Sequence, residues 1–214
     1  MSRTLVAAAV VAFAPAVLAA QQPDTTDYVI FRGADTVGTE RVVRVDVTRK
    51  GELIVRGALR PRITTWSTVL DEKGAAALVE ATEVETPPDP RMKAKVLHRT
   101  RVIFKADSAA VDDLTSNGML TDVFPTRVGA VPYLNLSVGT LEMAIAKALP
   151  AGAERGEVPL FSMAGAQTVV AEARRADGKV TLQVGKVAFD VTLDAAGRIT
   201  EATVPSQQLR IARR

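Results

Sequence analysis

Residues 180–193 read VTLQVGKVAFDVTL, and this stretch decides the fold class. Apolar and polar residues alternate on both sides of Gly185-Lys186, and this period of two is typical of half-buried β-strands. Glycine at the first of two loop residues suits a type II′ turn. The stretch therefore predicts a β-hairpin whose tip is Gly185-Lys186. Four side chains should be buried together on one face, opposite Asp190 and Thr192: Val187, Phe189, Val191 and Leu193.

The same alternation extends from this hairpin towards both ends of the chain. Two turns of the form Asp-x-x-Gly, Asp71–Gly74 and Asp194–Gly197, separate strands, because Asp can cap such a turn and Gly tolerates a positive φ. The pattern is least readable over residues 105–136, where Asn117-Gly118 and the region of Pro125 and Pro132 are expected to be loops crossing an end of the sheet. We expect strands at 28–31, 36–47, 53–59, 63–70, 75–85, 93–104, 199–204 and 208–212, besides the hairpin.

One segment has the period of an α-helix. Apolar residues between Val138 and Leu149 form one stripe at 100° per residue, with Ser137 as a plausible N-cap and Pro150 as the stop. Leu141, Ile145 and Leu149 should lie against the sheet, and Lys147 should be exposed. The sequence thus predicts a mainly β fold: an antiparallel meander forming a curved sheet or half-barrel, with one packed helix near 138–149.

Composition excludes several kinds of chemistry. The chain has no cysteine and one histidine, His98, so thiolate sites and sites with two or three histidines are excluded. Lys and Arg number 27 and Asp and Glu 24, a net charge of +3 that is too small to indicate a nucleic-acid partner. We expect no cofactor and no metal site.

The first residues resemble an export signal. Arg3 precedes an uncharged apolar run of ten residues from Leu5 to Ala14, and Val17-Leu18-Ala19 offers small or slim residues at a peptidase site. The run is shorter than the roughly 20 apolar residues that a membrane span needs. Residues 1–19 are therefore predicted to be a cleaved signal peptide, 20–214 a single β-rich domain, and the periplasm or the exterior its location.

Charges occur in blocks along the middle of the chain. The ionic residues are acidic between 74 and 90, basic from 91 to 105, and acidic again from 107 to 122. A basic strand between two acidic ones suits a meander, in which opposite charges face each other across the ladder; the alternative is a stripe that binds anions or nucleic acid. We expect strands 75–85 and 93–104 to pair antiparallel, with Glu83 and Glu85 near Lys93 and Lys95.

The same register would bring Glu80 opposite His98 on the inner face. A carboxylate that orients an imidazole is half of a catalytic triad, but the sequence offers neither a Gly-x-Ser-x-Gly nor a Ser-x-x-Lys nucleophile motif. A structural polar pair is therefore preferred over a hydrolytic site. The absence of catalytic motifs favours a protein that is not an enzyme.

The combination of a signal peptide, a long meander, one late amphipathic helix and a final hairpin ending in Asp194–Ile199 resembles exported bacterial β-meander families of unknown function. More distantly it is similar to the lipoprotein-localisation-factor superfamily, whose half-barrel holds acyl chains against helices. The resemblance implies that aromatic side chains on the concave face contact the ligand. The candidate ligand-binding residues are Trp66, Phe104, Tyr133 and Phe161.

Three functional hypotheses follow. The first is an exported, non-enzymatic protein that binds a lipid, another apolar small molecule or a lipidated partner on its curved sheet. The second is a structural or interaction module of the cell envelope with a filled core, whose partner is an envelope protein. The third is a hydrolase using Glu80 and His98. An open apolar cavity would distinguish the first from the second.

Overall fold

The computed structural model describes residues 23–56, 60–89 and 91–214. Within these ranges the chain forms one sheet of 15 strands and one α-helix, so the expected mainly β fold is confirmed. The predicted signal peptide, 1–19, lies outside the described residues. The elements are β1 Asp24–Arg32, β2 Asp35–Val45, β3 Thr48–Val55, β4 Arg62–Leu70, β5 Ala76–Glu85, β6 Lys95–Phe104, β7 Ser108–Thr115, β8 Gly118–Pro125, β9 Val131–Tyr133, α1 Val138–Ala148, β10 Arg155–Ser162, β11 Gln167–Ala176, β12 Lys179–Val184, β13 Val187–Leu193, β14 Ile199–Val204, the 3-10 turn η1 Pro205–Gln207 and β15 Leu209–Arg213.

The sheet is a meander joined through its first and last strands. Its order is β8 to β1 followed by β15 to β9, so β1 pairs with β15. All neighbours are antiparallel except β9 and β10, which are parallel. A parallel pair needs a crossover connection, usually helical, and here α1 supplies it. This crossover places the helix against the sheet.

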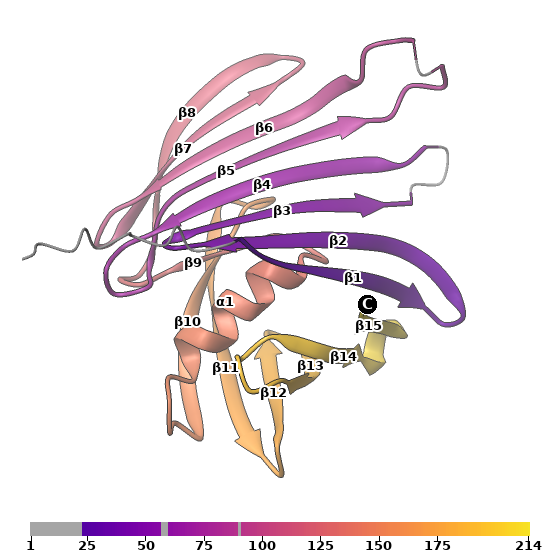
Figure 1. Ribbon diagram of the computed structural model, residues 1–214. Helices are drawn as coiled ribbons and strands as arrows, with labels where there is room; N and C mark the ends of the chain where they lie inside the picture. Colours follow the sequence, from indigo (N-terminus) through magenta and orange to yellow (C-terminus); the bar gives the residue numbers. More distant parts are fainter. Residues whose placement is uncertain (1–22, 57–59, 90) are drawn as a thin grey trace, which may run out of the picture.

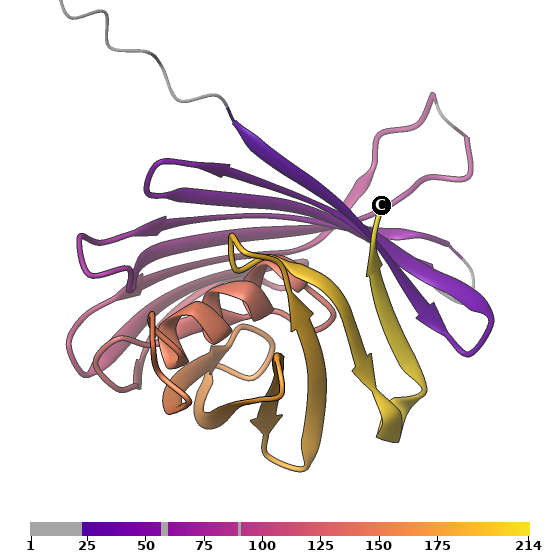
Figure 2. The same ribbon diagram turned by 60° about the horizontal axis from the view of Figure 1, so that its bottom comes forward.

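The sheet curls around the helix. Strands β1–β8 lie on one side of α1 and strands β9–β15 on the other (Figures 1 and 2). The helix packs against β2 and β3 from the first half and against β9, β10 and β11 from the second. The two halves also meet at β8 and β11, where the hydroxyl of Thr168 on β11 donates to the main-chain oxygen of Pro125, at the end of β8, over 3.3 Å. The sheet is thus strongly curved but stays open.

The hairpin that decided the fold class has the predicted register. Val184 pairs with Val187, which leaves Gly185-Lys186 as the tip, and Gly185 has the positive φ of +58° that its position requires. Val191 is fully buried, and its three neighbours on that face are half-buried against the core. Asp190 is exposed on the opposite face, as expected, and Thr192 is half-buried.

The helix is also confirmed, with one difference. Leu141, Ile145 and Leu149 are each at most 4% exposed. Lys147 is half-buried rather than exposed, because its ammonium donates to the main-chain oxygen of Lys73 over 3.1 Å. The loop between β4 and β5 therefore covers part of the helix face that the pattern had assigned to solvent.

The two Asp-x-x-Gly turns are built alike. Oδ1 of Asp71 accepts from the backbone N–H groups of Lys73 and Ala75, and Oδ1 of Asp194 accepts from those of Ala196 and Arg198. Each carboxylate thus fixes a tight turn through local hydrogen bonds. The two turns lie at the same cavity, described below.

The expectation of a loop at Asn117 is confirmed, since this residue lies in the turn between β7 and β8. The expectation of loops around Pro125 and Pro132 is wrong, because the segment 105–136 contains β7, β8 and the short β9. Its pattern is weak because β7 places Ala109 and Asp113 on its inner face, and β8 has no buried residue. An edge strand exposed on both faces shows no apolar alternation, so its sequence resembles that of a loop.

Strands β5 and β6 pair antiparallel as predicted, and the basic strand β6 lies between the acidic strands β5 and β7. The register differs from the expected one. Glu85 faces Lys95, but a bulge between Glu83 and Val84 brings Glu83 opposite His98. The connection between β5 and β6 is longer than expected, because β6 begins at Lys95 rather than at residue 93. Beyond the bulge, residues of β5 therefore share a face with different residues of β6 than the sequence had predicted.

Candidate functional site

The N-terminus of α1 is fixed by a buried carboxylate. Glu40 on β2 is 1% exposed, and its Oε1 accepts from the Ser137 hydroxyl over 2.7 Å and from the Trp66 indole over 2.9 Å. Its Oε2 accepts from the backbone N–H groups of Val138 and Gly139. The positive end of the helix dipole favours a carboxylate at this place. Burial raises the pKa of the Glu40 carboxyl, while the four donors oppose that rise.

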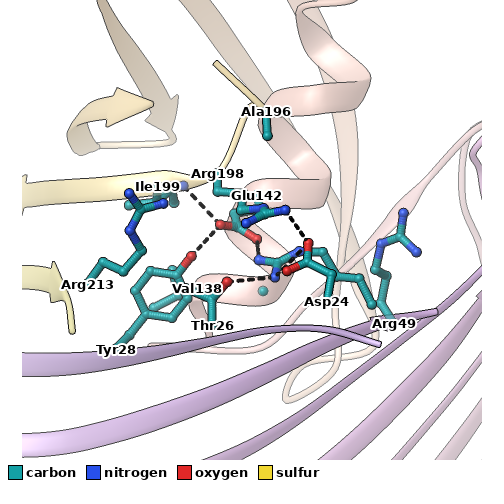
Figure 3. A network of polar contacts seen from close by, with 12 residues as sticks. Asp24, Thr26, Tyr28, Arg49, Val138, Glu142, Ala196, Arg198, Ile199 and Arg213 are labelled. Carbon is teal, nitrogen blue, oxygen red and sulfur yellow. Dashed lines mark hydrogen bonds and ion pairs between the residues drawn. The ribbon is translucent and has the colours of Figure 1, made fainter. Parts of the chain in front are cut away.

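A second buried carboxylate lies on the helix itself. Oε1 of Glu142 accepts from the Tyr28 hydroxyl over 2.6 Å and from the backbone N–H of Ile199 over 2.9 Å (Figure 3). Its Oε2 forms an ion pair with the Arg44 guanidinium. Burial raises the pKa of the Tyr28 hydroxyl, and the neighbouring Glu142 raises it further. Glu142 therefore joins α1 to β1, β2 and β14.

The network continues from Glu142 towards solvent. Arg44 also donates to the Thr26 hydroxyl over 3.0 Å and lies 3.9 Å from Asp24. Asp24 in turn pairs with Arg198 over 2.6 Å. Figure 3 shows this chain of groups running from Tyr28, beneath the helix, to the turn between β13 and β14.

An apolar cavity of about 210 Å³ lies on the side of α1 that faces strands β12 to β15. Leu141 of the helix lines it together with apolar residues of the C-terminal strands, notably Val187, Phe189 and Ile211. Asn135 and Gln207 add polar groups to its lining. It is larger than the roughly 150 Å³ cavity that holds a benzene ring in an engineered protein.

A polar cavity of about 640 Å³ lies along another face of the helix. Glu142, Met143 and Lys147 line it from α1, and the two Asp-x-x-Gly turns contribute Lys73 and Arg198. It shares no lining residue with the apolar cavity. The anchored helix therefore has a separate hollow on each of two faces.

The four aromatic residues proposed as ligand contacts are divided between two places. Tyr133 lines the apolar cavity, and burial raises the pKa of its hydroxyl. Phe104 and Phe161 instead pack edge to face in the core, with ring centroids 5.6 Å apart. Trp66 is 3% exposed and bonded to Glu40. Only Tyr133 therefore lies where a ligand in the apolar cavity would contact it.

The expected pair of Glu80 and His98 does not form, and this prediction is wrong. Glu80 is opposite Arg101 and points to the outer face, where their charged groups are 3.7 Å apart. His98 lies on the inner face, where its Nε2 contacts the carboxylate of Asp113. The bulge in β5–β6 pairing and the longer connection place the two residues on opposite faces. The hydrolase hypothesis, which needs this pair, is dropped.

Glu40 and Glu142, the two central carboxylates, were not predicted as site residues. The sequence does contain one signal for Glu40. On the predicted strand 36–47 it lies on the same face as Gly38 and Val42, the face expected to point into the core. An acidic residue at such a position needs buried partners. Glu142 gives a weaker signal, since it borders the apolar stripe of the helix.

Two further observations concern the described part of the chain. It contains no group of three or more His, Cys, Asp or Glu side chains arranged to hold a metal ion. Nor does any helix within it have the length and apolar character needed to cross a membrane.

No family model and no curated protein matches the chain. Among solved structures, it is similar to the crystal structure of a DUF1089 family protein from Pseudomonas aeruginosa. The TM-score is 0.56 at 10% sequence identity, over 81% of this chain and 92% of that one. This likeness shows a shared β-rich fold with a protein of a family named only as a domain of unknown function.

Proposed function

We propose that the chain is an exported, non-enzymatic binding protein that holds an apolar small molecule, such as part of a lipid, between α1 and strands β12–β15. The observation that carries this proposal is the apolar cavity of about 210 Å³. Its size is below the roughly 300–1,000 Å³ of pockets for drug-sized ligands. It suits one ring or a short segment of an acyl chain.

The walls of the cavity support this proposal. Val187 and Phe189 are half-buried at the cavity, although they belong to the apolar face of a strand. An apolar ligand would remove this remaining surface from water, at roughly 25 cal/mol per Å². The half-barrel of the lipoprotein-localisation-factor superfamily, which the sequence resembles, binds acyl chains in the same general arrangement of sheet and helix.

The polar groups of the interior favour a binding role over catalysis. Every carboxylate oxygen of Glu40 and Glu142 accepts a hydrogen bond or forms an ion pair with another group of the protein. Carboxylates held in this way position the helix. Neither residue lines the apolar cavity. Export remains part of the proposal on the basis of residues 1–19.

A small apolar probe tests the proposal. In isothermal titration calorimetry the wild-type chain should bind toluene, a single ring, and Val187→Lys should abolish this binding because a cation would enter the apolar cavity. Ala188→Lys is the matched control, since its side chain lies on the opposite face of β13 and outside the cavity lining. Native mass spectrometry of the chain purified from its host would identify a co-purified lipid.

The alternative function is a structural or interaction module of the cell envelope with a filled core. Absence of both probe binding and co-purified lipid from folded wild-type protein would favour this alternative. Equal loss of binding in both lysine variants would also count against the cavity as the binding site.

A further inference from the structure

The polar cavity beside α1 has an excess of positive charge. It lies between the hairpin turns β2–β3 and β4–β5, one face of α1 and the turn β13–β14. Its lining includes five basic and three acidic residues, an excess of two positive charges. The basic residues are Arg44, Arg49, Lys73, Lys147 and Arg198.

Two of the three carboxylates in this cavity are already neutralised. Glu142 pairs with Arg44, and Asp24 pairs with Arg198. The third, Asp46, is exposed in the β2–β3 turn. Across residues 23–56, 60–89 and 91–214, no carboxylate lies within the 4.0 Å of an ion pair with the remaining cations, Arg49, Lys73 and Lys147.

Arg49 is held in place by main-chain groups and keeps donors free. Its Nη1 donates to the main-chain oxygens of Asp46 and Thr48 over 2.7 and 3.0 Å. Its Nε and Nη2 have no hydrogen-bond partner in the described part of the chain. Burial lowers the pKa of the Arg49 guanidinium and the nearby Arg44 lowers it further, while the carboxylates of Asp24 and Glu142 oppose this shift without reversing it.

Lys147 is fixed as well. Its ammonium donates one hydrogen bond to the main-chain oxygen of Lys73, and an ammonium has three donors. The Lys73 side chain is exposed on the same turn. Three cations thus border one hollow from β3, α1 and the β4–β5 turn, with unused donors on at least two of them.

We propose that this cavity is a binding site for the phosphate group of a small molecule. A guanidinium and two ammonium groups without carboxylate partners match the several acceptor oxygens of a phosphate. The volume of about 640 Å³ exceeds what the phosphate alone needs, so an attached organic group fits beside it. The phosphate comes either from a free metabolite or from a lipid headgroup. The site is separate from the apolar cavity and stands independently of the function proposed there.

Isothermal titration calorimetry of the full chain with inorganic phosphate at low ionic strength tests the site. Saturable binding should be weakened about tenfold or more by Arg49→Gln and several-fold by Lys73→Gln, because each change removes a charged donor. Lys73→Gln is a safe variant for the fold, since the helix contacts the main-chain oxygen of this residue and not its side chain. Arg99→Gln, an exposed cation on β6, is the control and should leave binding unchanged.

Glycerol phosphate and a short-chain phosphatidic acid distinguish the two sources of the phosphate. Tighter binding of the phosphatidic acid, lost in Arg49→Gln, supports a lipid headgroup. Equal or tighter binding of glycerol phosphate, lost in the same variant, supports a free phosphate ester. Absence of saturable binding at about 10 mM of every ligand, or equal weakening by Arg99→Gln, would overturn the proposal. Neither result depends on whether the apolar probe binds.

Discussion

Trp66 and Gly51 face each other across β3 and β4, and the indole occupies the place that a side chain on Gly51 would need. A Cβ at Gly51 would lie 2.6 Å from Cζ2 of the indole, too close for real atoms. Gly51→Ala should therefore displace Trp66 from Glu40. We expect the free energy of unfolding to fall by about 1–3 kcal/mol, measured by urea denaturation.

Gly165→Ala is the control for this substitution. A Cβ there would meet nothing closer than the side chain of Gln167 at 3.5 Å, which is an ordinary contact. A loss of stability as large as that of Gly51→Ala would show that the indole contact is not the cause.

Replacement of the buried Glu40 should be among the single substitutions that lower the free energy of unfolding most. Glu40→Ala leaves four donors without their acceptor, including two N–H groups at the start of α1. Each unsatisfied buried group costs about 1–3 kcal/mol, so we expect a loss of roughly 4 kcal/mol or more. Denaturation midpoints measure this loss, and Glu52→Ala, an exposed acidic residue on β3, should change them little. Similar midpoints for the two variants would contradict the anchoring role.

The same residue should give the fold a characteristic pH dependence. Burial raises the pKa of the Glu40 carboxyl from its ordinary value of 4.5, so the folded chain binds this proton more tightly than the unfolded chain does. The resulting stabilisation is full below pH 4.5 and is lost as the pH rises through the raised value. Relative to the non-titrating variant Glu40→Gln, wild-type protein should therefore lose stability with rising pH above that point.

Carboxyl groups with a lowered pKa stabilise the fold as the pH rises, which is opposite to the effect of Glu40. Their contributions cancel when wild type is compared with Glu40→Gln. A hydrogen bond from Arg41 lowers the pKa of Asp27, and backbone N–H donors, first that of Arg198, lower the pKa of Asp194. Both contributions are shared by wild type and Glu40→Gln. Parallel stability curves for the two proteins above pH 4.5 would show that burial does not raise the pKa of Glu40.

Sequence patterns predicted the elements that have one clear buried face. The β12–β13 hairpin and α1 were found because the alternation around Gly185-Lys186 and the stripe of the helix each reflect a single apolar surface. The exposed strand β8 lacks such a surface. Strand β10 was not anticipated either, since its Leu160 and Phe161 are consecutive and both fully buried, which breaks alternation.

The candidate site was less predictable than the fold. Which residues face each other depends on register, and one bulge in β5–β6 was enough to separate Glu80 from His98. Local sequence carries little information about such a bulge. The partners of Glu142 lie 57 to 114 residues away along the chain, so no local motif links them.

Both tyrosines of the chain should resist ionisation. Burial raises the pKa of Tyr133, and burial together with Glu142 raises that of Tyr28. Spectrophotometric titration should therefore show no tyrosinate at the ordinary pKa of about 10 until the protein unfolds. The unfolded chain ionises first, so stability should fall as the pH rises above that value. Tyrosinate formation near pH 10 with unchanged circular dichroism would contradict this assignment.

Strand β8 forms one edge of the sheet, pairing with β7 on one side and with no described strand on the other. Met119, Leu120 and Val123 on it are 63–72% exposed. An apolar edge with free backbone groups invites pairing with another chain.

Leu120→Lys combined with Val123→Lys on β8 should therefore reduce light scattering of concentrated protein. Because neither side chain is buried, the free energy of unfolding should change by no more than about 0.5 kcal/mol for each substitution. Val111→Lys on β7 is the contrasting variant, since its 6% exposed side chain lies in the core and the change should unfold the chain. If the double variant scatters as much as wild type, the edge is not the surface through which the chains associate.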